Sequence, residues 1–220
     1  MNYFYLYIFI LSIFIISISY LNTYRETFNS RIQHFILLGD SIFKNDLYVS
    51  DGKSINDLLL ERTNGNTTCL AKDDTKIVNV YNQILNIPDE LNNKYTTIFL
   101  SVGGNDILSQ IENNSLSSDT LKTIFIAYKK LIESIQMKSL NANLVLCDIY
   151  YPDNLKYKQY KGNIETWNQM IYDYSREEKN NIKSVLKLSS ILTKPEDFTF
   201  DIEPSSIGSQ KMVDAILSSY

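Results

Sequence analysis

Short apolar runs alternate with segments of helical periodicity over most of this chain, and that alternation limits its fold more than any other feature. Each run is short enough to be a buried strand. Between the runs, apolar side chains such as Leu121, Ile124 and Phe125 recur at the spacing of a helix with one buried face. Strands joined by helices pair in parallel, so the sequence predicts an α/β domain. The expected strands are residues 34–38, 67–71, 97–102, 144–149 and 184–188.

Several helices of this domain can be placed from the same periodicity. The pattern predicts helices over residues 77–85, 121–135 and 164–174, and Pro88 ends the first of these patterns. The last helix is expected to start near Pro204 and Ser205, because proline suits the first turn and serine can cap free N–H groups. Trp167 has helical spacing from Ile164 and is expected in the core.

The amino terminus forms a separate part in this interpretation. Residues 3–21 carry no charge, and at a helical rise of about 1.5 Å they approach the roughly 30 Å thickness of a bilayer core. We therefore expect a single-pass membrane protein, with a transmembrane signal anchor at 1–22, a tether at 23–33 and one folded domain at 34–220.

A cleaved signal peptide is the alternative for the amino terminus. Against it, no Lys or Arg precedes Arg25 and no A-x-A site follows the apolar stretch. Arg25 and Arg31 follow the apolar stretch, but two arginines beside Glu26 leave the side of the membrane open.

Charge and cysteine usage exclude some classes of partner. The chain has 21 Lys+Arg and 25 Asp+Glu, a net charge of -4, and no basic stripe, so we expect no nucleic-acid partner. Cys69 and Cys147 lie within apolar runs and form no C-x-x-C pair, so neither a disulfide framework nor a zinc site is expected. The sequence contains no G-x-G-x-x-G or P-loop pattern, and we expect no cofactor.

Two distinctive motifs follow the first and third apolar runs. They are Gly39-Asp40-Ser41-Ile42 and Gly103-Gly104-Asn105-Asp106. In parallel sheets the ligand crevice lies beyond the carboxyl ends of the strands, and glycine lets the backbone turn sharply there. Ser41 could then attack an ester carbonyl while the Asn105 amide donates to the oxyanion that forms. Asp40 and Asp106 are expected to tie down loop N–H groups.

With these motifs the sequence resembles the SGNH, or GDSL, hydrolase superfamily of esterases, lipases, thioesterases and carbohydrate deacetylases. The nucleophile block is matched by ILLGDSIF and the Asn-bearing block by SVGGND, while DIEPSSIG stands where the family usually has an Asp-x-x-His-Pro segment. It looks closest to a bacterial subgroup with LLGDSIF, SVGGND and IEPS blocks. The resemblance runs from His34 to Leu217. It implies a three-layer α/β/α, flavodoxin-like fold with a five-stranded parallel sheet.

The resemblance also implies a substrate and roles for individual residues. The substrate would be an acyl or acetyl ester of a lipid or carbohydrate. Ser41 would be the nucleophile, and its N–H and the Asn105 amide would be two oxyanion donors. Family members usually supply a third donor from a glycine N–H after the second strand, and here Asp74 stands in that place. Tyr150 and Pro152 begin the loop after the fourth strand and either line the substrate pocket or pack the loop.

The largest departure from the family is the missing histidine base. Glu203 stands in its place, and Asp201 precedes it by two residues rather than three. The only histidine, His34, lies about 23 Å from Ser41 along an extended run, at the opposite end of the sheet. Glu203 is either a general base with a pKa raised by burial or by Asp201, or a carboxylate favoured at a helix start. The sequence therefore predicts a membrane-anchored serine esterase; the alternative is a protein of the same fold that binds an acyl or glycan ligand without turnover.

Overall fold

The computed structural model describes residues 3–29, 33–152 and 154–219. Side chains are described at residues 5, 7, 8 and 10–20 and throughout the two later ranges. The chain divides into two units, residues 1–33 and 34–220.

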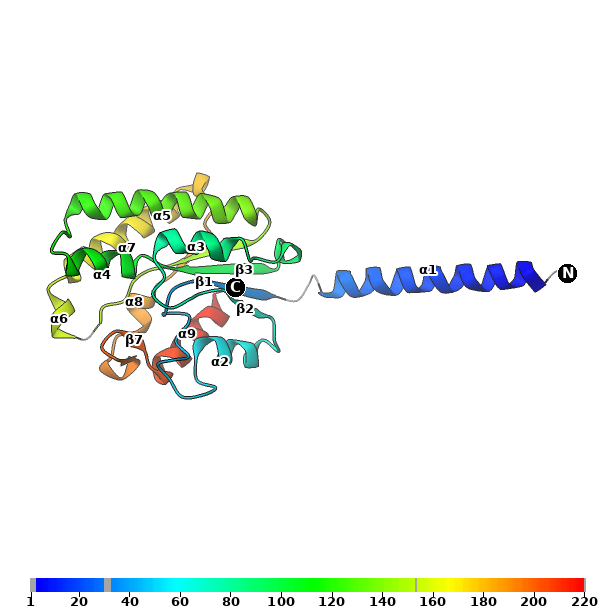
Figure 1. The fold of residues 1–220 in the computed structure, drawn as a ribbon, viewed down its shortest axis with the longest axis horizontal. Coiled ribbons are helices and arrows are strands. Elements are labelled where there is room, and N and C mark those ends of the chain that lie inside the picture. The colour runs from blue at the N-terminus through cyan, green and yellow to red at the C-terminus, as the bar shows by residue number, and fades with distance from the viewer. Residues whose placement is uncertain (1–2, 30–32, 153, 220) are drawn as a thin grey trace. The chain divides into compact units, whose positions relative to one another are not determined.

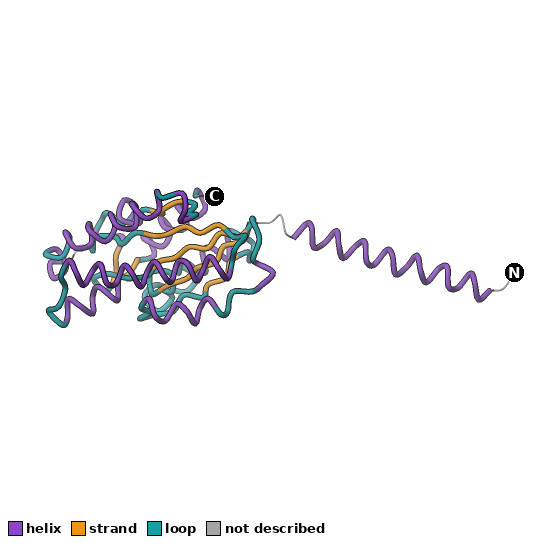
Figure 2. The backbone as a smooth tube through the Cα atoms, turned by 90° about the horizontal axis from the view of Figure 1, so that it is seen from above, coloured by secondary structure: helices purple, strands orange, loops and turns teal. Residues whose placement is uncertain are grey.

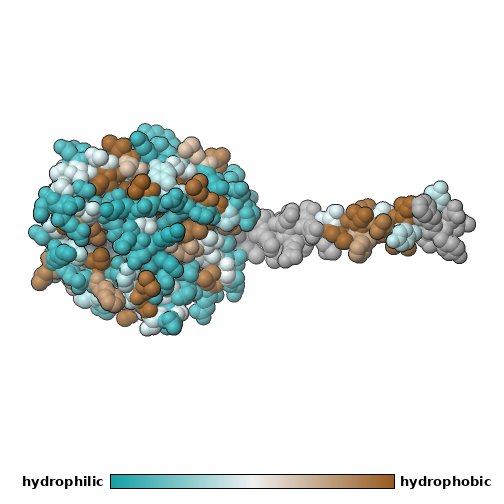
Figure 3. All heavy atoms as spheres, viewed as in Figure 1, coloured by the Kyte–Doolittle hydropathy of each residue, from teal (hydrophilic) through white to brown (hydrophobic). Residues whose placement is uncertain are grey.

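The first unit contains helix α1, Tyr3–Asn29. Its described side chains include exposed apolar residues such as Ile10, Phe14 and Ile16 (Figure 3). In the part of the chain that the structure describes, no helix combines the length and the apolarity needed to cross a bilayer, so the expected membrane span is not confirmed. The expected tether is helical as far as Asn29, and residues 30–32 lie outside the described ranges.

The second unit is built on a five-stranded sheet of order β2-β1-β3-β4-β5. All neighbouring strands of this sheet are parallel, as the alternation of apolar runs and helices predicts. Both faces of such a sheet are buried, which is why its strands appear as continuous apolar runs in the sequence. The strands are β1 (His34–Gly39), β2 (Thr67–Cys69), β3 (Thr96–Ser101), β4 (Asn143–Cys147) and β5 (Ser184–Leu186).

Alternate residues of each strand face opposite helical layers, which produces two cores. Ile36, Ile98 and Leu144 pack with helices α3, α4, α5 and α7, and Phe35, Phe99 and Val145 pack with α2, α8 and α9. Figures 1 and 2 show these helices on the two sides of the sheet. The helices are α2 (Ile55–Arg62), α3 (Ile77–Ile84), α4 (Gly104–Glu112), α5 (Ser118–Lys138), α6 (Leu155–Lys158), α7 (Lys161–Arg176), α8 (Leu188–Ile191) and α9 (Ser206–Ser218).

Short elements complete the domain. Short 3₁₀ helices lie at Asp89–Leu91, Glu178–Asn180 and Pro195–Asp197. Strands β6 (Phe198–Thr199) and β7 (Glu203–Pro204) pair antiparallel and form a small ribbon before α9.

The expected helices α3, α5, α7 and α9 are present, and the start of α9 differs from the expectation at one residue. Ser205 caps α9 by accepting hydrogen bonds from the N–H groups of Ile207 and Gly208. Pro204 is therefore not in the first turn of α9; it lies in extended backbone in β7 and pairs with Phe198. Helix α4 is not among the helices expected from periodicity, since glycines at its start disfavour a helix; the burial of Ile107 and Ile111 accounts for it.

Candidate active site

Two glycines bring the loop that carries Ser41 and the start of α4, which carries Asn105, to the same edge of the sheet. Gly39 ends β1 with φ +134°, and a Cβ there would lie 1.7 Å from the carbonyl oxygen of Ser101 in β3. Gly103 precedes α4 with φ +111°, and a Cβ there would lie 2.5 Å from a ring carbon of Trp167. Only glycine fits either turn, so each strand turns sharply into the residues that follow.

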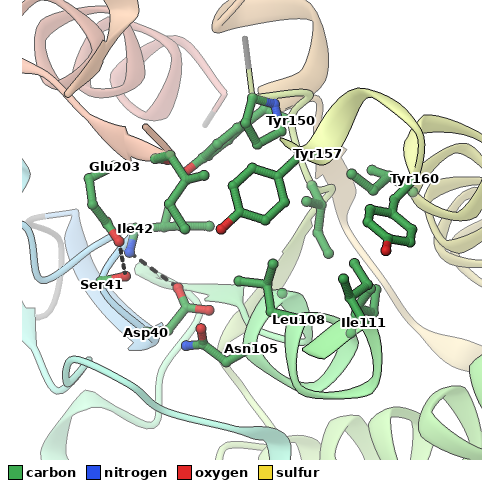
Figure 4. A pocket seen from close by; sticks show the side chains of 16 residues that line it. Asp40, Ser41, Ile42, Asn105, Leu108, Ile111, Tyr150, Tyr157, Tyr160 and Glu203 are labelled. Atoms are coloured by element: carbon green, nitrogen blue, oxygen red, sulfur yellow. Dashed lines mark hydrogen bonds between the residues drawn. The ribbon is translucent and has the colours of Figure 1, made fainter. Parts of the chain in front are cut away.

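Ser41 and Asn105 line one cavity beyond the ends of β1 and β3. Asp40 and Glu203 also line it, and these four residues form its polar end (Figure 4). The remaining lining side chains are apolar or aromatic and come from α4, α6, α7 and the loops after β1, β4, α6 and β6. They are Ile42, Ile107, Leu108, Ile111, Ile149, Tyr150, Pro152, Tyr157, Tyr160, Ile164 and Ile202.

Glu203 lies beside Ser41. The Ser41 hydroxyl donates a hydrogen bond to Oε1 of Glu203 at 3.1 Å (Figure 4). This distance is slightly longer than usual for O–H···O, as is common for catalytic hydrogen bonds that tighten when substrate binds. Both residues are buried, and Glu203 Oε2 has no hydrogen-bond partner among the described residues. Burial is the main cause that raises the pKa of Glu203 from 4.5 to about 7, and the charges of Asp73 and Asp74 add to the effect.

Asp40 is a second buried carboxyl group at the polar end. Its Oδ1 accepts a hydrogen bond from the N–H of Ile42 at 3.2 Å, so it ties down the turn after Ser41 as expected. Burial raises the pKa of Asp40 to about 8 despite this bond, and the nearby Glu203 contributes in the same direction. Asp106 lies in the first turn of α4, and its Oδ2 accepts from the N–H of Ile77 at 3.0 Å, so it ties down the first residue of α3 rather than a loop.

The expected oxyanion donors differ in whether their N–H groups are already bonded to other acceptors. One hydrogen of the Asn105 amide donates to the carbonyl oxygen of Thr75 at 3.1 Å, which fixes the side chain and leaves the second hydrogen for a ligand. Around Ser41, the N–H groups of Asp40, Ile42 and Phe43 all have acceptors within the loop or on Ser101. The Asp74 N–H donates to Oδ1 of Asp73 at 3.0 Å.

Two of the expected site residues are not brought to the cavity. Asp74 is exposed and lines a separate polar hollow, and its φ of +52° lies in the left-handed region that favours glycine. Asp201 is also exposed, has a φ of +72°, and lines another hollow with Asn154 and Phe200. Neither residue is among those that line the cavity, so Asp201 does not orient Glu203 as an aspartate would orient a histidine.

The other titratable candidates lie away from the cavity. His34 begins β1 at the opposite end from Ser41, and its Nε2 is 2.9 Å from the hydroxyl of Thr68. Cys147 is buried in β4, and burial raises its thiol pKa well above the usual value. Among the described side chains, no group of three His, Cys, Asp or Glu residues could hold a metal ion.

Two features of the site could not be predicted from the sequence. Tyr157 and Tyr160 line the apolar end, but they lie in a segment where no periodicity identified α6. Asn45 is completely buried behind Ser41 and makes hydrogen bonds to three segments. In a chain rich in Asn, no sequence signal distinguishes it.

Comparisons with known proteins agree on the fold. No protein-family profile and no curated protein sequence matches the chain. Among solved structures, a member of the lipolytic protein G-D-S-L family from Veillonella parvula aligns with a TM-score of 0.67 at 18% identity, over 84% of this chain and 97% of its own. Phospholipase A1 from Streptomyces albidoflavus aligns with a TM-score of 0.64 at 12% identity, over 86% and 100%. An acetyl xylan esterase aligns with a TM-score of 0.63 at 17% identity, over 84% of this chain and 98% of its own.

The chain therefore has the fold of the GDSL, or SGNH, hydrolases, and the resemblance inferred from its motifs is confirmed at the level of the fold. The expected three-layer α/β/α architecture with a five-stranded parallel sheet is confirmed as well.

Proposed function

We propose that the protein is a serine esterase in which Ser41 is the nucleophile and Glu203 is the general base. One observation carries this proposal: the hydrogen bond of 3.1 Å from the Ser41 hydroxyl to Glu203 Oε1 at the polar end of a cavity. A general base works best when its pKa lies near the working pH, and the pKa of about 7 for Glu203 meets that condition without a histidine.

The reaction follows the usual course of acyl transfer. Glu203 takes the hydroxyl proton as Ser41 Oγ bonds to the ester carbonyl carbon, and the carbonyl oxygen becomes an oxyanion. The free hydrogen of the Asn105 amide and the Ser41 N–H donate to that oxygen. Glu203 then returns the proton to the leaving alcohol, the carbon–oxygen ester bond breaks, and water hydrolyses the acyl-serine by the same steps in reverse.

The cavity favours an ester with an apolar acyl group over an acetylated sugar. Residues of α4 from Asn105 to Ile111 line one wall of the cavity. These two residues are six positions apart, so the wall is about 9 Å long at helical rise. A zigzag chain with bonds of about 1.5 Å needs on the order of seven carbons to cover that length. Burying such a chain against leucine, isoleucine and tyrosine side chains is favourable, whereas burying sugar hydroxyls without partners is not.

The test uses the purified full chain, a fluorophosphonate probe and aryl esters of increasing acyl length between pH 5 and 9. We expect covalent labelling at Ser41 and ester hydrolysis, both lost in Ser41→Ala. The matched control is Ser50→Ala, an exposed serine in the loop that follows β1, which should change neither readout. A folded wild-type protein that neither labels nor cleaves any ester refutes the esterase.

One observation favours a second candidate, a ligand-binding protein without turnover. The Asp74 N–H, in the place of the family's third oxyanion donor, already donates to Asp73. A binder of this kind would retain an acyl ligand in the cavity and yet show no reaction in the experiment above.

We also propose that residues 1–22 attach the domain to a membrane. The support is the uncharged stretch from residue 3 to residue 21 and the exposure of Ile10, Phe14 and Ile16 in α1. Full chain should stay in the membrane pellet after an alkaline carbonate wash, and a chain that starts at residue 23 should not. Recovery of both in the supernatant would end this part of the proposal.

A further inference from the structure

Glu203 lies in a structure that is weak by itself. The β6–β7 ribbon pairs only Phe198 with Pro204 and Thr199 with Glu203, and two-stranded ribbons of this size are not stable alone. The turn between its strands places Phe200 and Asp201 at φ +44° and +72°, a region that costs free energy for residues other than glycine. Contacts outside the ribbon must therefore hold Glu203 against Ser41.

Two buried side chains hold the peptide groups on both sides of Glu203. The Tyr150 hydroxyl donates to the carbonyl oxygen of Ile202, the residue before Glu203. The Asn45 amide donates to the carbonyl oxygen of Pro204, the residue after it, at 3.1 Å. Asn45 is completely buried and Tyr150 is 4% exposed, so water cannot easily replace either bond.

Asn45 connects the ribbon to the nucleophile's own loop. It lies four residues after Ser41, in a turn where the N–H groups of Phe43 and Lys44 both donate to the Asp40 carbonyl oxygen. Its Nδ2 also donates to the Ser209 hydroxyl of α9 at 2.6 Å, and its Oδ1 accepts from the Ile55 N–H at the start of α2 at 3.0 Å. One side chain thus fixes the turn after Ser41 relative to the segment after Glu203.

Tyr150 connects the ribbon to the central sheet. It follows β4, and its ring packs on Phe198 of β6 with ring centroids 5.2 Å apart. The ring also lines the cavity (Figure 4), so the residue that holds the Ile202 carbonyl forms part of the wall beside Glu203.

We propose that Asn45 and Tyr150 are positioning residues, which hold the two peptide groups around Glu203 and so set the distance between its carboxylate and the Ser41 hydroxyl. This inference rests on the proposed function for its effect on catalysis. Its effect on the environment of Glu203 does not depend on activity.

The main test is Tyr150→Phe, which removes the hydroxyl and keeps the ring. The readout is the carboxyl pKa of Glu203, followed by carbon-13 NMR and assigned with Glu203→Gln. The titratable groups around Glu203 are Asp40, Asp73, Asp74, Tyr48 and Tyr150, and none of the carboxyl groups among them is altered. Loosening the ribbon admits water, so we expect the Glu203 pKa to fall by about one unit or more towards its ordinary value.

A matched control makes the same change elsewhere. Tyr172→Phe in α7 removes a hydroxyl that donates to Asp148, a carboxylate that does not line the cavity. This variant loses one tyrosine hydrogen bond as well, yet the Glu203 pKa should stay where it is in the wild type. If Tyr150→Phe does not fold, Asn45→Ala provides a second test of the positioning role.

Activity provides the second readout. On a short-chain aryl ester we expect kcat to fall by up to about 100-fold in Tyr150→Phe with little change in KM, because misplacement of a catalytic group affects the chemical step. An unchanged Glu203 pKa in a folded Tyr150→Phe or Asn45→Ala protein overturns the inference. If the pKa shifts but the wild type hydrolyses no ester, the positioning role stands and the proposed esterase fails.

Discussion

The two ends of the cavity are built in opposite ways. At the polar end, the buried groups Ser41, Asp40 and Glu203 are held by hydrogen bonds from neighbouring loops. At the other end, Leu108 and Ile111 of α4 and Tyr160, the residue before α7, offer apolar surface. The polar end has carboxyl groups with raised pKa values, and the apolar end has none.

The two ends of the cavity therefore have different consequences for the protein. Burial makes the charged form of these carboxyl groups costly, so the polar end lowers folding stability while it gives Glu203, the base that we propose, a pKa near 7. The apolar end stabilises the fold and would select the acyl group by burial. Substitutions at the first end should affect every substrate alike, and substitutions at the second should affect only long ones.

The largest effect should follow from Glu203→Gln. Glutamine can still accept the hydrogen bond from Ser41 but cannot take its proton, so we expect kcat to fall by about 100- to 10,000-fold for short and long esters equally. The wild-type rate should also decline as the pH drops below about 7, where Glu203 becomes protonated, and the variant should lack this decline. Steady-state kinetics over pH 5 to 9 measures both.

The control for this change lies two residues away. Asp201→Asn alters an exposed carboxylate outside the cavity and should leave kcat and the pH profile unchanged. A loss of rate comparable to that of Glu203→Gln would mean that the two acidic residues act together, against the geometry described above.

An effect confined to long esters should follow from Ile111→Trp at the apolar end. The larger ring fills the cavity beyond Leu108, so the rate ratio of octanoyl to acetyl ester should fall by about tenfold or more while acetyl ester hydrolysis is kept. Ile126→Trp, at an exposed position on α5, is the size-matched control and should not alter the ratio. Equal losses for both esters would show that the acyl chain does not bind there.

The smallest effect should be on stability. Asp40 and Glu203 bind protons more tightly in the folded chain, with pKa values of about 8 and 7, than in the unfolded chain. Their contribution is therefore complete below about pH 4 and is lost as the pH rises through 7 and 8. Urea unfolding between pH 5 and 9 should show this decline, and Asp40→Asn should make it shallower. A stability that rises across this range would contradict the burial of these groups as ionisable carboxyls.

Much of the fold could be predicted from local pattern. The five strands follow from continuous apolar runs, and α5 follows from the spacing of Leu121, Phe125 and Tyr128. Helix α4 could not be predicted in this way, because its Gly-Gly start contradicts helix propensity and is compensated by the burial of Ile107 and Ile111. The ribbon before α9 was also missed, because each of its strands has only two residues.

The site was partly predictable for a related reason. Ser41 and Asn105 follow neighbouring strands, and the carboxyl ends of parallel strands meet at one edge, so their common cavity follows from topology. Asp74 and Asp201 were placed by their position in motifs alone, and their exposed side chains lie in other hollows.

The α/β class, the order of the motifs and the position of a serine and an amide at strand ends can be predicted from the residues alone. Each of these features depends on apolar periodicity and glycine positions within a few neighbouring residues. The contact between Glu203 and Ser41 and the position of Asp201 outside the cavity depend on the tertiary structure. So do the hydrogen bonds by which Asn45 and Tyr150 hold the residues on either side of Glu203. These contacts join distant parts of the chain: the Ser41–Glu203 contact joins residues 162 positions apart, and the burial that raises the pKa of Glu203 exists only once the ribbon is packed against Tyr150 and bonded to Asn45.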